Sequence, residues 1–219
     1  ARFPVKTPTT FVGAGSSLDF ALDQADLEFV EKATLCQSFK NGSGHFVGVF
    51  VRGEHWIRPE RALFASLGYI AHSANFTKKE TVPLSPWQNL ESEYEFAPKL
   101  DYFTVEAGAR ERLFGSHFSA GVSLSASFLA SHDFEFTERV LSPDDFPWQE
   151  RTISNGQIKG LNSINISPKL FAAFDLSIAN SWYADFSAGV SFPINDIAGN
   201  KEWKRWSLSL GVTVYRGLR

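Results

Sequence analysis

The sequence predicts an all-β fold, a single eight-stranded antiparallel barrel of the up-and-down type that covers residues 1–219. Three observations predict it. Segments of roughly 10 to 15 residues alternate strictly between apolar and polar side chains, about eight such segments follow one another, and the connections between them are alternately short and long. The composition agrees, because Phe 21, Trp 6 and Tyr 5 favour strands over helices.

The clearest alternation runs from His117 to Ala130, with Phe118 to Ala130 apolar on one parity and Ser119 to Ser127 small and polar on the other. The segments 182–192 and 206–215 repeat this pattern, and weaker copies lie at 9–21, 45–56, 61–74, 99–113 and 160–177. Pro168 interrupts the last of these. We expect a β-bulge or a local break there, because proline cannot donate a ladder hydrogen bond.

The connections differ in length in a regular order. Tight turns are expected at 56–60, 114–116 and 178–181, whereas long polar loops are expected at 22–44, 75–98 and 132–159, with a shorter one near 195–202. Short periplasmic turns and long extracellular loops are typical of outer-membrane barrels. Strands of this length also suit a bilayer crossing, which needs about 9 to 11 tilted residues, better than an ordinary globular sheet.

A transmembrane helix is excluded, because no run of about 18 apolar residues is present. We therefore expect a barrel in the bacterial outer membrane. The chain begins with Ala1 instead of Met, which is consistent with a signal peptide that has been removed, and residues 1–8 are expected to form a short periplasmic segment.

The polar parity indicates what fills the lumen. Small serines and glycines suit a crowded interior, and they leave room for a few larger charged side chains. Because buried charges must be paired, we expect an ionic network inside the barrel and no open channel. Its candidate members are Arg52, Glu106, Arg110, Arg112, Lys169, Asp175 and Asp185, and Asp19 and Glu54 share their parity.

Four tryptophans near predicted strand ends are expected in the aromatic girdles that flank the hydrocarbon band: Trp56, Trp182, Trp203 and Trp206. A soluble sandwich core could also use such residues. The long loops are acidic and aromatic, and one of them offers a candidate partner-docking surface at Asp144, Asp145, Phe146 and Trp148. Such a charge run can equally serve only to keep a loop solvated.

Motifs for cofactor chemistry are absent from the sequence, so no cofactor and no metal site is expected. The net charge of -3 argues against a nucleic-acid partner. The single Cys36 cannot close a disulfide within the chain, and its role stays open. An envelope lipid-modifying enzyme remains an alternative, with His45, His72, His132 and Asp19 as candidate residues. A soluble lipocalin-like carrier would require an apolar lumen.

The segments at 10–15, 166–170 and 210–216 resemble the small outer-membrane β-barrel proteins of the Bacteroidota type, a porin-like family that includes PorT-like barrels and shares its architecture with OmpX and OmpA. The resemblance implies an outer-membrane location and no single activity. The leading interpretation is a non-enzymatic barrel that acts as a structural or partner-binding subunit, as part of a larger outer-membrane transport or secretion complex. Its expected partners are outer-membrane lipid and other outer-membrane or periplasmic proteins.

Overall fold

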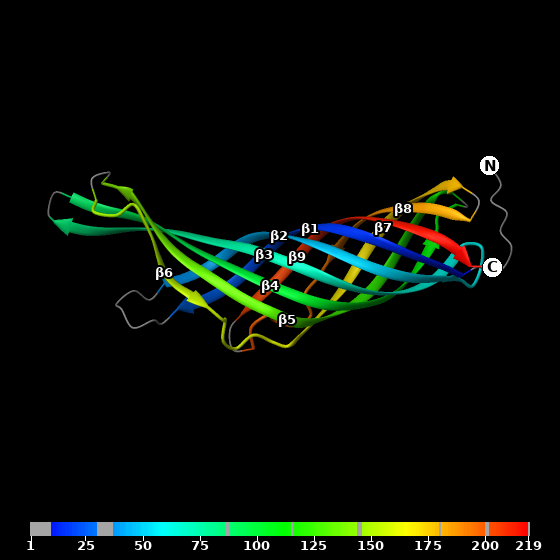
Figure 1. Ribbon diagram of the computed structural model, residues 1–219, viewed down its shortest axis with the longest axis horizontal. Helices are drawn as coiled ribbons and strands as arrows, with labels where there is room; N and C mark the ends of the chain where they lie inside the picture. The colour runs from blue at the N-terminus through cyan, green and yellow to red at the C-terminus, as the bar shows by residue number, and fades with distance from the viewer. Residues whose placement is uncertain are drawn as a thin grey trace.

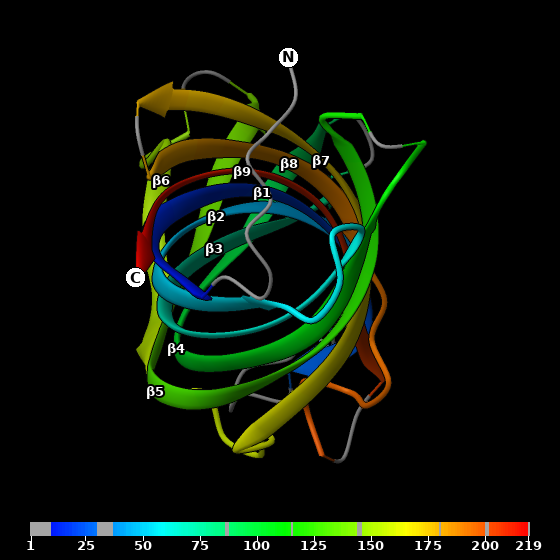
Figure 2. The same ribbon diagram turned by 90° about the vertical axis from the view of Figure 1, so that its right-hand side faces the viewer.

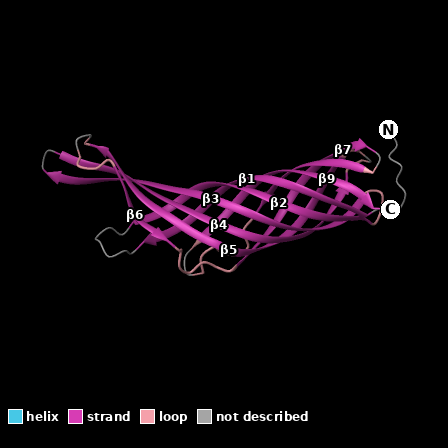
Figure 3. Cartoon of the chain, viewed as in Figure 1, coloured by secondary structure: helices cyan, strands magenta, loops and turns pink. Residues whose placement is uncertain are grey.

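Within the residues that the structure describes, the computed structural model has nine β-strands. Figure 3 draws them as arrows along one elongated barrel. The structure describes residues 10–29, 37–85, 88–114, 116–143, 146–179, 181–199 and 202–218. Within these ranges no helix is long and apolar enough to cross a membrane. The strands are β1 (Thr10–Phe29), β2 (Gln37–Trp56), β3 (Arg61–Ser85), β4 (Gln88–Arg112), β5 (Phe118–Ser142), β6 (Glu150–Gly156), β7 (Ile164–Ala179), β8 (Trp182–Ser191) and β9 (Trp203–Leu218).

Eight of these strands close into a ring. Each pairs antiparallel with its neighbours in the order β4, β3, β2, β1, β9, β8, β7, β5, and the pairing of β4 with β5 completes the circle. The view along the barrel shows this closed wall (Figure 2). The predicted eight-stranded antiparallel barrel is confirmed. The short strand β6 was not predicted; it stands outside the ring and pairs only with the far part of β5.

The tight turns also lie where the sequence predicts them. β2 ends at Trp56 and β3 begins at Arg61, β4 gives way to β5 between Arg112 and Phe118, and β7 ends three residues before β8 begins. Two of these turns use the left-handed region of the backbone, at Phe114 (φ 54°) and Ser181 (φ 70°). All three turns, the start of β1 and the end of β9 lie at one end of the barrel (Figure 1).

The prediction of long loops at the other end is wrong in extent. β3, β4 and β5 are 25 residues long each, so most of 75–98 and the first part of 132–159 are strand. Figure 1 shows these strands running on past the ring as a projecting sheet. The segment resembles a loop in composition because charged residues cover its outer face. The expected loop at 22–44 is likewise too long, because β1 runs to Phe29 and β2 begins at Gln37. The predicted periplasmic segment at 1–8 and Cys36 fall outside the described residues.

The alternation within the strands is reproduced in burial. On β5, Val122 and Leu124 are exposed on the outer surface while Ser119 and Ser123 are buried inside. On β9, Leu208 and Leu210 are exposed while Ser207, Ser209 and Thr213 are buried. Apolar side chains therefore face outward and small polar ones inward, which excludes a lipocalin-like arrangement with an apolar lumen.

The bulge expected at Pro168 is absent, because β5 and β7 pair without a register shift and Leu124 lies opposite Pro168. The Pro168 carbonyl accepts a hydrogen bond from the Phe192 backbone N–H at 3.0 Å. The nitrogen and carbonyl of one strand residue point to the same side, so the proline nitrogen faces the β8 side. The β7–β8 ladder ends beside Pro168, at Lys169 and Ser191, which is the local break that was expected, and the proline has no N–H with which to return a bond to Phe192.

Candidate functional site

The lumen at the end that carries the tight turns is filled by a cluster centred on Arg110. Its Nη2 lies 2.8 Å from Glu54 Oε1, and its Nη1 lies 3.2 Å from Asp175 Oδ1 and 2.5 Å from Asp185 Oδ2. Arg112 Nη2 approaches Asp175 Oδ2 at 3.5 Å. The structure thus brings together four of the predicted network residues with Glu54, from strands β2, β4, β7 and β8.

Aromatic side chains cover this cluster. The Trp56 ring packs on the guanidinium of Arg112, with 3.9 Å between the guanidinium carbon and the ring centroid. Tyr183 and Tyr215 stack at 4.7 Å between centroids, and the Tyr183 hydroxyl donates to Glu54 at 2.9 Å. Gly13 makes room for Tyr215, because a Cβ there would meet that ring at 2.8 Å. The turn-side end of the lumen is therefore blocked.

A second ion pair lies nearer the middle of the lumen. Arg52 Nη2 contacts Glu106 Oε2 at 3.2 Å, and the Ser123 hydroxyl donates to Glu106 Oε1 at 2.6 Å. Both ion-pair members and Lys169 line a central chamber of about 160 Å³. Lys169, the seventh predicted member of the network, has no carboxylate within 4.0 Å among the residues the structure describes.

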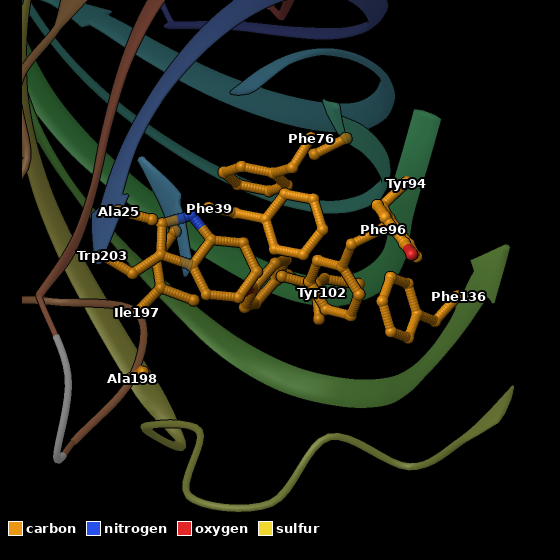
Figure 4. Close-up of a cluster of buried hydrophobic side chains, with 12 residues drawn as sticks. Ala25, Phe39, Phe76, Tyr94, Phe96, Tyr102, Phe136, Ile197, Ala198 and Trp203 are labelled. Carbon is orange, nitrogen blue, oxygen red and sulfur yellow. The ribbon is translucent and has the colours of Figure 1, made fainter. Parts of the chain in front are cut away.

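The opposite end of the lumen is filled by an aromatic cluster, shown in Figure 4. Phe76 packs edge-on against Trp203 at 5.6 Å between ring centroids, and Phe39 packs against both Phe96 and Phe136. The Trp203 Nε1–H donates to Asp23 Oδ1 at 2.8 Å, and Asp23 also accepts from Arg205. Sequence reasoning missed this cluster. The signal was the alternation of Tyr94 and Phe96 in the segment 75–98, which was expected to form a loop.

The four candidate girdle tryptophans divide into two pairs. Trp182 and Trp206 lie on the outer surface, 43% and 45% exposed, whereas Trp56 and Trp203 are 5% and 0% exposed inside the barrel. The girdle assignment is therefore wrong for Trp56 and Trp203. Their rings point inward, where Trp56 covers the arginines and Trp203 donates to Asp23, and proximity to a strand end does not determine which face a side chain takes.

Exposed apolar side chains form a continuous belt around the outside of the ring. The two exposed tryptophans, Trp182 and Trp206, lie about ten residues apart along β9, because Trp182 is paired with Arg216. This is the length that a tilted strand needs to cross a bilayer. A surface of this kind requires an apolar surrounding. Belt residues on five of the strands are Val12, Leu18 and Phe20; Val47, Val49 and Val51; Leu63 and Leu67; Val122 and Leu124; and Leu208, Leu210 and Val214.

Beyond the row formed by Phe76, Phe96 and Phe136, strands β3, β4 and β5 continue with β6 as a projecting sheet. Here Glu138 is buried, accepts from the Tyr94 hydroxyl at 3.0 Å and pairs with Arg151 at 2.6 Å. Burial, together with the hydrogen bond to Glu138, raises the pKa of Tyr94 to about 12. The outer face carries cross-strand ion pairs, such as Lys79 with Glu93.

The candidate docking segment adjoins this sheet. Phe146 and Trp148 pack edge-on at 4.9 Å between ring centroids, and the Arg151 guanidinium lies 4.1 Å from the Trp148 centroid. Phe146 and Trp148 are both half-buried. Asp144 and Asp145 fall outside the described residues, so the structure places only the aromatic half of the predicted set.

The histidines considered for catalysis do not share one surface. His45 is exposed, His72 is buried in the lumen, and the His132 ring nitrogen accepts from the Ile158 backbone N–H at 3.2 Å. His72 lies 4.0 Å from Asp23, and His72 and the predicted Asp19 both line the central chamber of the lumen. In the described part of the chain, no group of three or more His, Cys, Asp or Glu residues could hold a metal ion.

No family model matches the chain, and no curated protein sequence matches it. Similar solved structures include Ail, the attachment invasion locus protein of Yersinia pestis, at 12% identity over 94% of this chain and 98% of Ail, with a TM-score of 0.36. Neisserial surface protein A aligns at 9% identity, 95% and 99% coverage and a TM-score of 0.38. The outer membrane protease OmpT from Escherichia coli aligns at 8% identity over 100% of this chain and 99% of OmpT, with a TM-score of 0.41.

The closed ring and its apolar belt by themselves indicate that the barrel is surrounded by lipid. A closed barrel satisfies the ladder hydrogen bonds of its ring between its own strands, and its outward side chains on these strands are apolar. The chain has the architecture of an integral outer-membrane β-barrel.

Proposed function

We propose that this barrel is a non-enzymatic structural or partner-binding subunit of a larger outer-membrane transport or secretion assembly. We include in this proposal its kinship with the porin-like barrels of the Bacteroidota, which rests on the resemblance of the three sequence segments. The function lies in what the barrel presents outside the bilayer, and the lumen serves as its packed core.

One observation carries the proposal: both ends of the lumen are blocked while three strands continue beyond the belt. The Arg110 cluster with Trp56 fills the turn-side end, and the aromatic cluster around Trp203 fills the other. A barrel built in this way has no open path for solute. The projecting sheet offers a rigid platform instead, because β3, β4 and β5 hold it in register with the barrel wall.

The proposed contact region is at the end of this platform, at Phe146 and Trp148, together with Asp144 and Asp145, which precede them in the sequence. Trp148 is held in place by Arg151, which is itself anchored on the buried Glu138. An aromatic pair on a preorganised support, beside acidic residues in the sequence, is a chemistry that suits another outer-membrane protein, because this platform lies at the end of the barrel opposite the short turns.

The test is chemical cross-linking in native membranes, followed by detergent extraction, size separation and identification of the proteins that co-purify. We expect a stoichiometric partner for the wild-type chain and its loss when Asp144 and Asp145 become Lys and Phe146 becomes Ser. The matched control is Glu60→Lys, which reverses an exposed acidic residue in the turn at the opposite end. A lone barrel, or a partner retained by the triple variant, would contradict the proposal and favour the enzymatic alternative.

A further inference from the structure

An open groove of about 770 Å³ crosses the apolar belt on the outside of the barrel, over β4, β5, β7, β8 and β9. It is hollow because alanines occupy its outward positions, where the surrounding belt carries valine, leucine and phenylalanine. The alanines are Ala109 on β4, Ala120 on β5, Ala172 on β7 and Ala188 on β8. Lipid chains that pass this part of the belt therefore meet a hollow instead of a ridge.

The groove runs obliquely from the turn-side rim of the barrel to the middle of the belt. Its row of ladder partners starts at Glu111, the last residue but one of β4, and continues to Leu210, well inside β9. The partners between them are Ala120, Ala172 and Ala188. Four strand spacings of about 4.8 Å give the row a length of about 19 Å. One leaflet occupies about 15 Å, half of a hydrocarbon core of about 30 Å, so an oblique chain in the groove stays within the turn-side leaflet.

The charged groups of the groove are confined to its rim end. Arg61 Nη2 lies 3.0 Å from Glu111 Oε2, and both side chains are more than half exposed. The guanidinium of Arg110, another lining residue, points into the lumen toward Glu54. The other lining residues are apolar or glycine. A ligand for this groove must therefore be apolar along most of its length, charged at one end, and able to arrive from the membrane.

The rim pair selects the kind of charged end. A guanidinium binds a phosphate through parallel N–H donors, and a carboxylate accepts hydrogen bonds from an ammonium group. Arg61 and Glu111 together match a headgroup that carries both a phosphate and an ammonium. A headgroup with a net negative charge would be attracted by Arg61 and repelled by Glu111. A second barrel seated in the groove would take the exposed pair out of water, which is costly.

We propose that the groove is a binding site for one glycerophospholipid with a phosphoethanolamine headgroup, drawn from the leaflet on the side of the tight turns. The phosphate lies at Arg61, the ammonium at Glu111, and an acyl chain follows the alanine row beneath the larger side chains of Val122 and Leu170. This chain gains contacts on both sides that chains on the convex parts of the belt lack. The lipid therefore stays on the barrel when the other surrounding lipids are exchanged for detergent.

Native mass spectrometry of the full chain tests this site. The purified barrel in detergent micelles is given equal amounts of phosphatidylethanolamine and phosphatidylglycerol with identical acyl chains. We expect one bound phosphatidylethanolamine per barrel, preferred by about fivefold, which is the effect of one exposed charge pair. No retained lipid, equal retention of the two lipids, or a dimer that binds neither would overturn the proposal.

Two alanine-to-leucine variants separate the groove from the rest of the belt. Ala172→Leu fills the groove and should abolish lipid retention. Ala14→Leu adds the same side chain to the exposed outer face of β1, beside Val51 and Val214, and should retain the lipid as the wild type does. Equal retention by the two variants would contradict the site, and Ala188→Leu takes the place of Ala172→Leu if that variant does not fold.

A charge reversal at the rim tests the headgroup. In Glu111→Lys the neighbour of Arg61 is a second cation, so this variant should still retain one lipid but should prefer phosphatidylglycerol. The control is Glu91→Lys, which reverses an exposed acidic residue on the projecting sheet and should leave the preference unchanged. A preference for phosphatidylethanolamine that persists in Glu111→Lys would contradict the proposed headgroup contact.

Discussion

Arg110 donates to Glu54 across the interior of the barrel, with 2.8 Å between Nη2 and Oε1, and the side chains of both residues are 3% or less exposed. Two further carboxylates, of Asp175 and Asp185, contact the other terminal nitrogen of the same guanidinium. One arginine thus contacts three buried carboxylates from three other strands, and Arg112 adds a second positive charge beside Asp175.

Replacing Arg110 with Met should lower the free energy of unfolding by about 3–5 kcal/mol, because it leaves buried carboxylates without their cation. The measurement is urea unfolding in detergent micelles, followed by tryptophan fluorescence. Arg61→Gln is the control, since the Arg61–Glu111 pair is more than half exposed and such pairs contribute about 0–1 kcal/mol. Equal costs for the two variants would show that the buried cluster adds nothing beyond a surface pair.

The outward belt predicts the result of placing a charge in it. Val122 is 55% exposed on the outer surface of β5, opposite Ala109 and Leu170, so Val122→Arg should cost about 2–4 kcal/mol if the site lies near the bilayer midplane. Refolding into vesicles measures this cost. Thr81→Arg, on the exposed projecting sheet, should leave the free energy of unfolding unchanged. A tolerated arginine at 122 would refute a lipid-facing belt.

Two tryptophans three residues apart on β9 should respond differently to the same change. Trp203→Phe removes the donor to Asp23 and should cost about 1–3 kcal/mol, because the buried acceptor loses a partner. Trp206→Phe on the outer surface should cost about 0.5 kcal/mol or less. Unfolding curves of the two variants measure both losses of stability. A larger loss for Trp206→Phe than for Trp203→Phe would contradict the placement of Trp203 inside the lumen.

The projecting sheet should lose stability in strong alkali. The folded pKa of Tyr94, about 12, lies above the ordinary value of 10, so its contribution is complete below pH 10 and is lost as the pH rises toward 12. Limited proteolysis of the sheet measures this loss as the difference in stability between the wild-type chain and the Tyr94→Phe variant at each pH. A difference that stays constant from pH 9 to pH 12 would contradict the raised pKa. Tyrosinate absorbance of the two proteins provides an independent check.

Much of the barrel could be predicted because alternation is a local property of strands. Val122 and Ser123 are neighbours in sequence and must point to opposite faces, so the parity of one strand assigns its outer and inner residues. Short turns follow equally from local composition. For the same reason Arg110, Asp175 and Asp185 could be placed on the inward parity before any contact between them was known.

The errors arose where the local signal was ambiguous. Glu91, Glu93 and Glu95 read as a loop, although they occupy the outer face of β4 while Tyr94 and Phe96 point inward. Trp56 and Trp203 were assigned to the bilayer interface from their position near strand ends. A girdle residue must also have outward parity, and the indole of each of these two points into the lumen.

The sequence by itself determined that this protein is a barrel with an apolar exterior and a polar, charged interior, because residue parity along each strand sets which face meets lipid. Only the tertiary structure decided which charges meet, which ends of the lumen are blocked and how far the strands project. Those features depend on the register between strands that are distant in the chain, such as β2 with β8 around Glu54 and Tyr183, and on the space that glycines such as Gly13 leave for aromatic rings. Register across a closed ring is a property of all its strands at once, so no single segment encodes it.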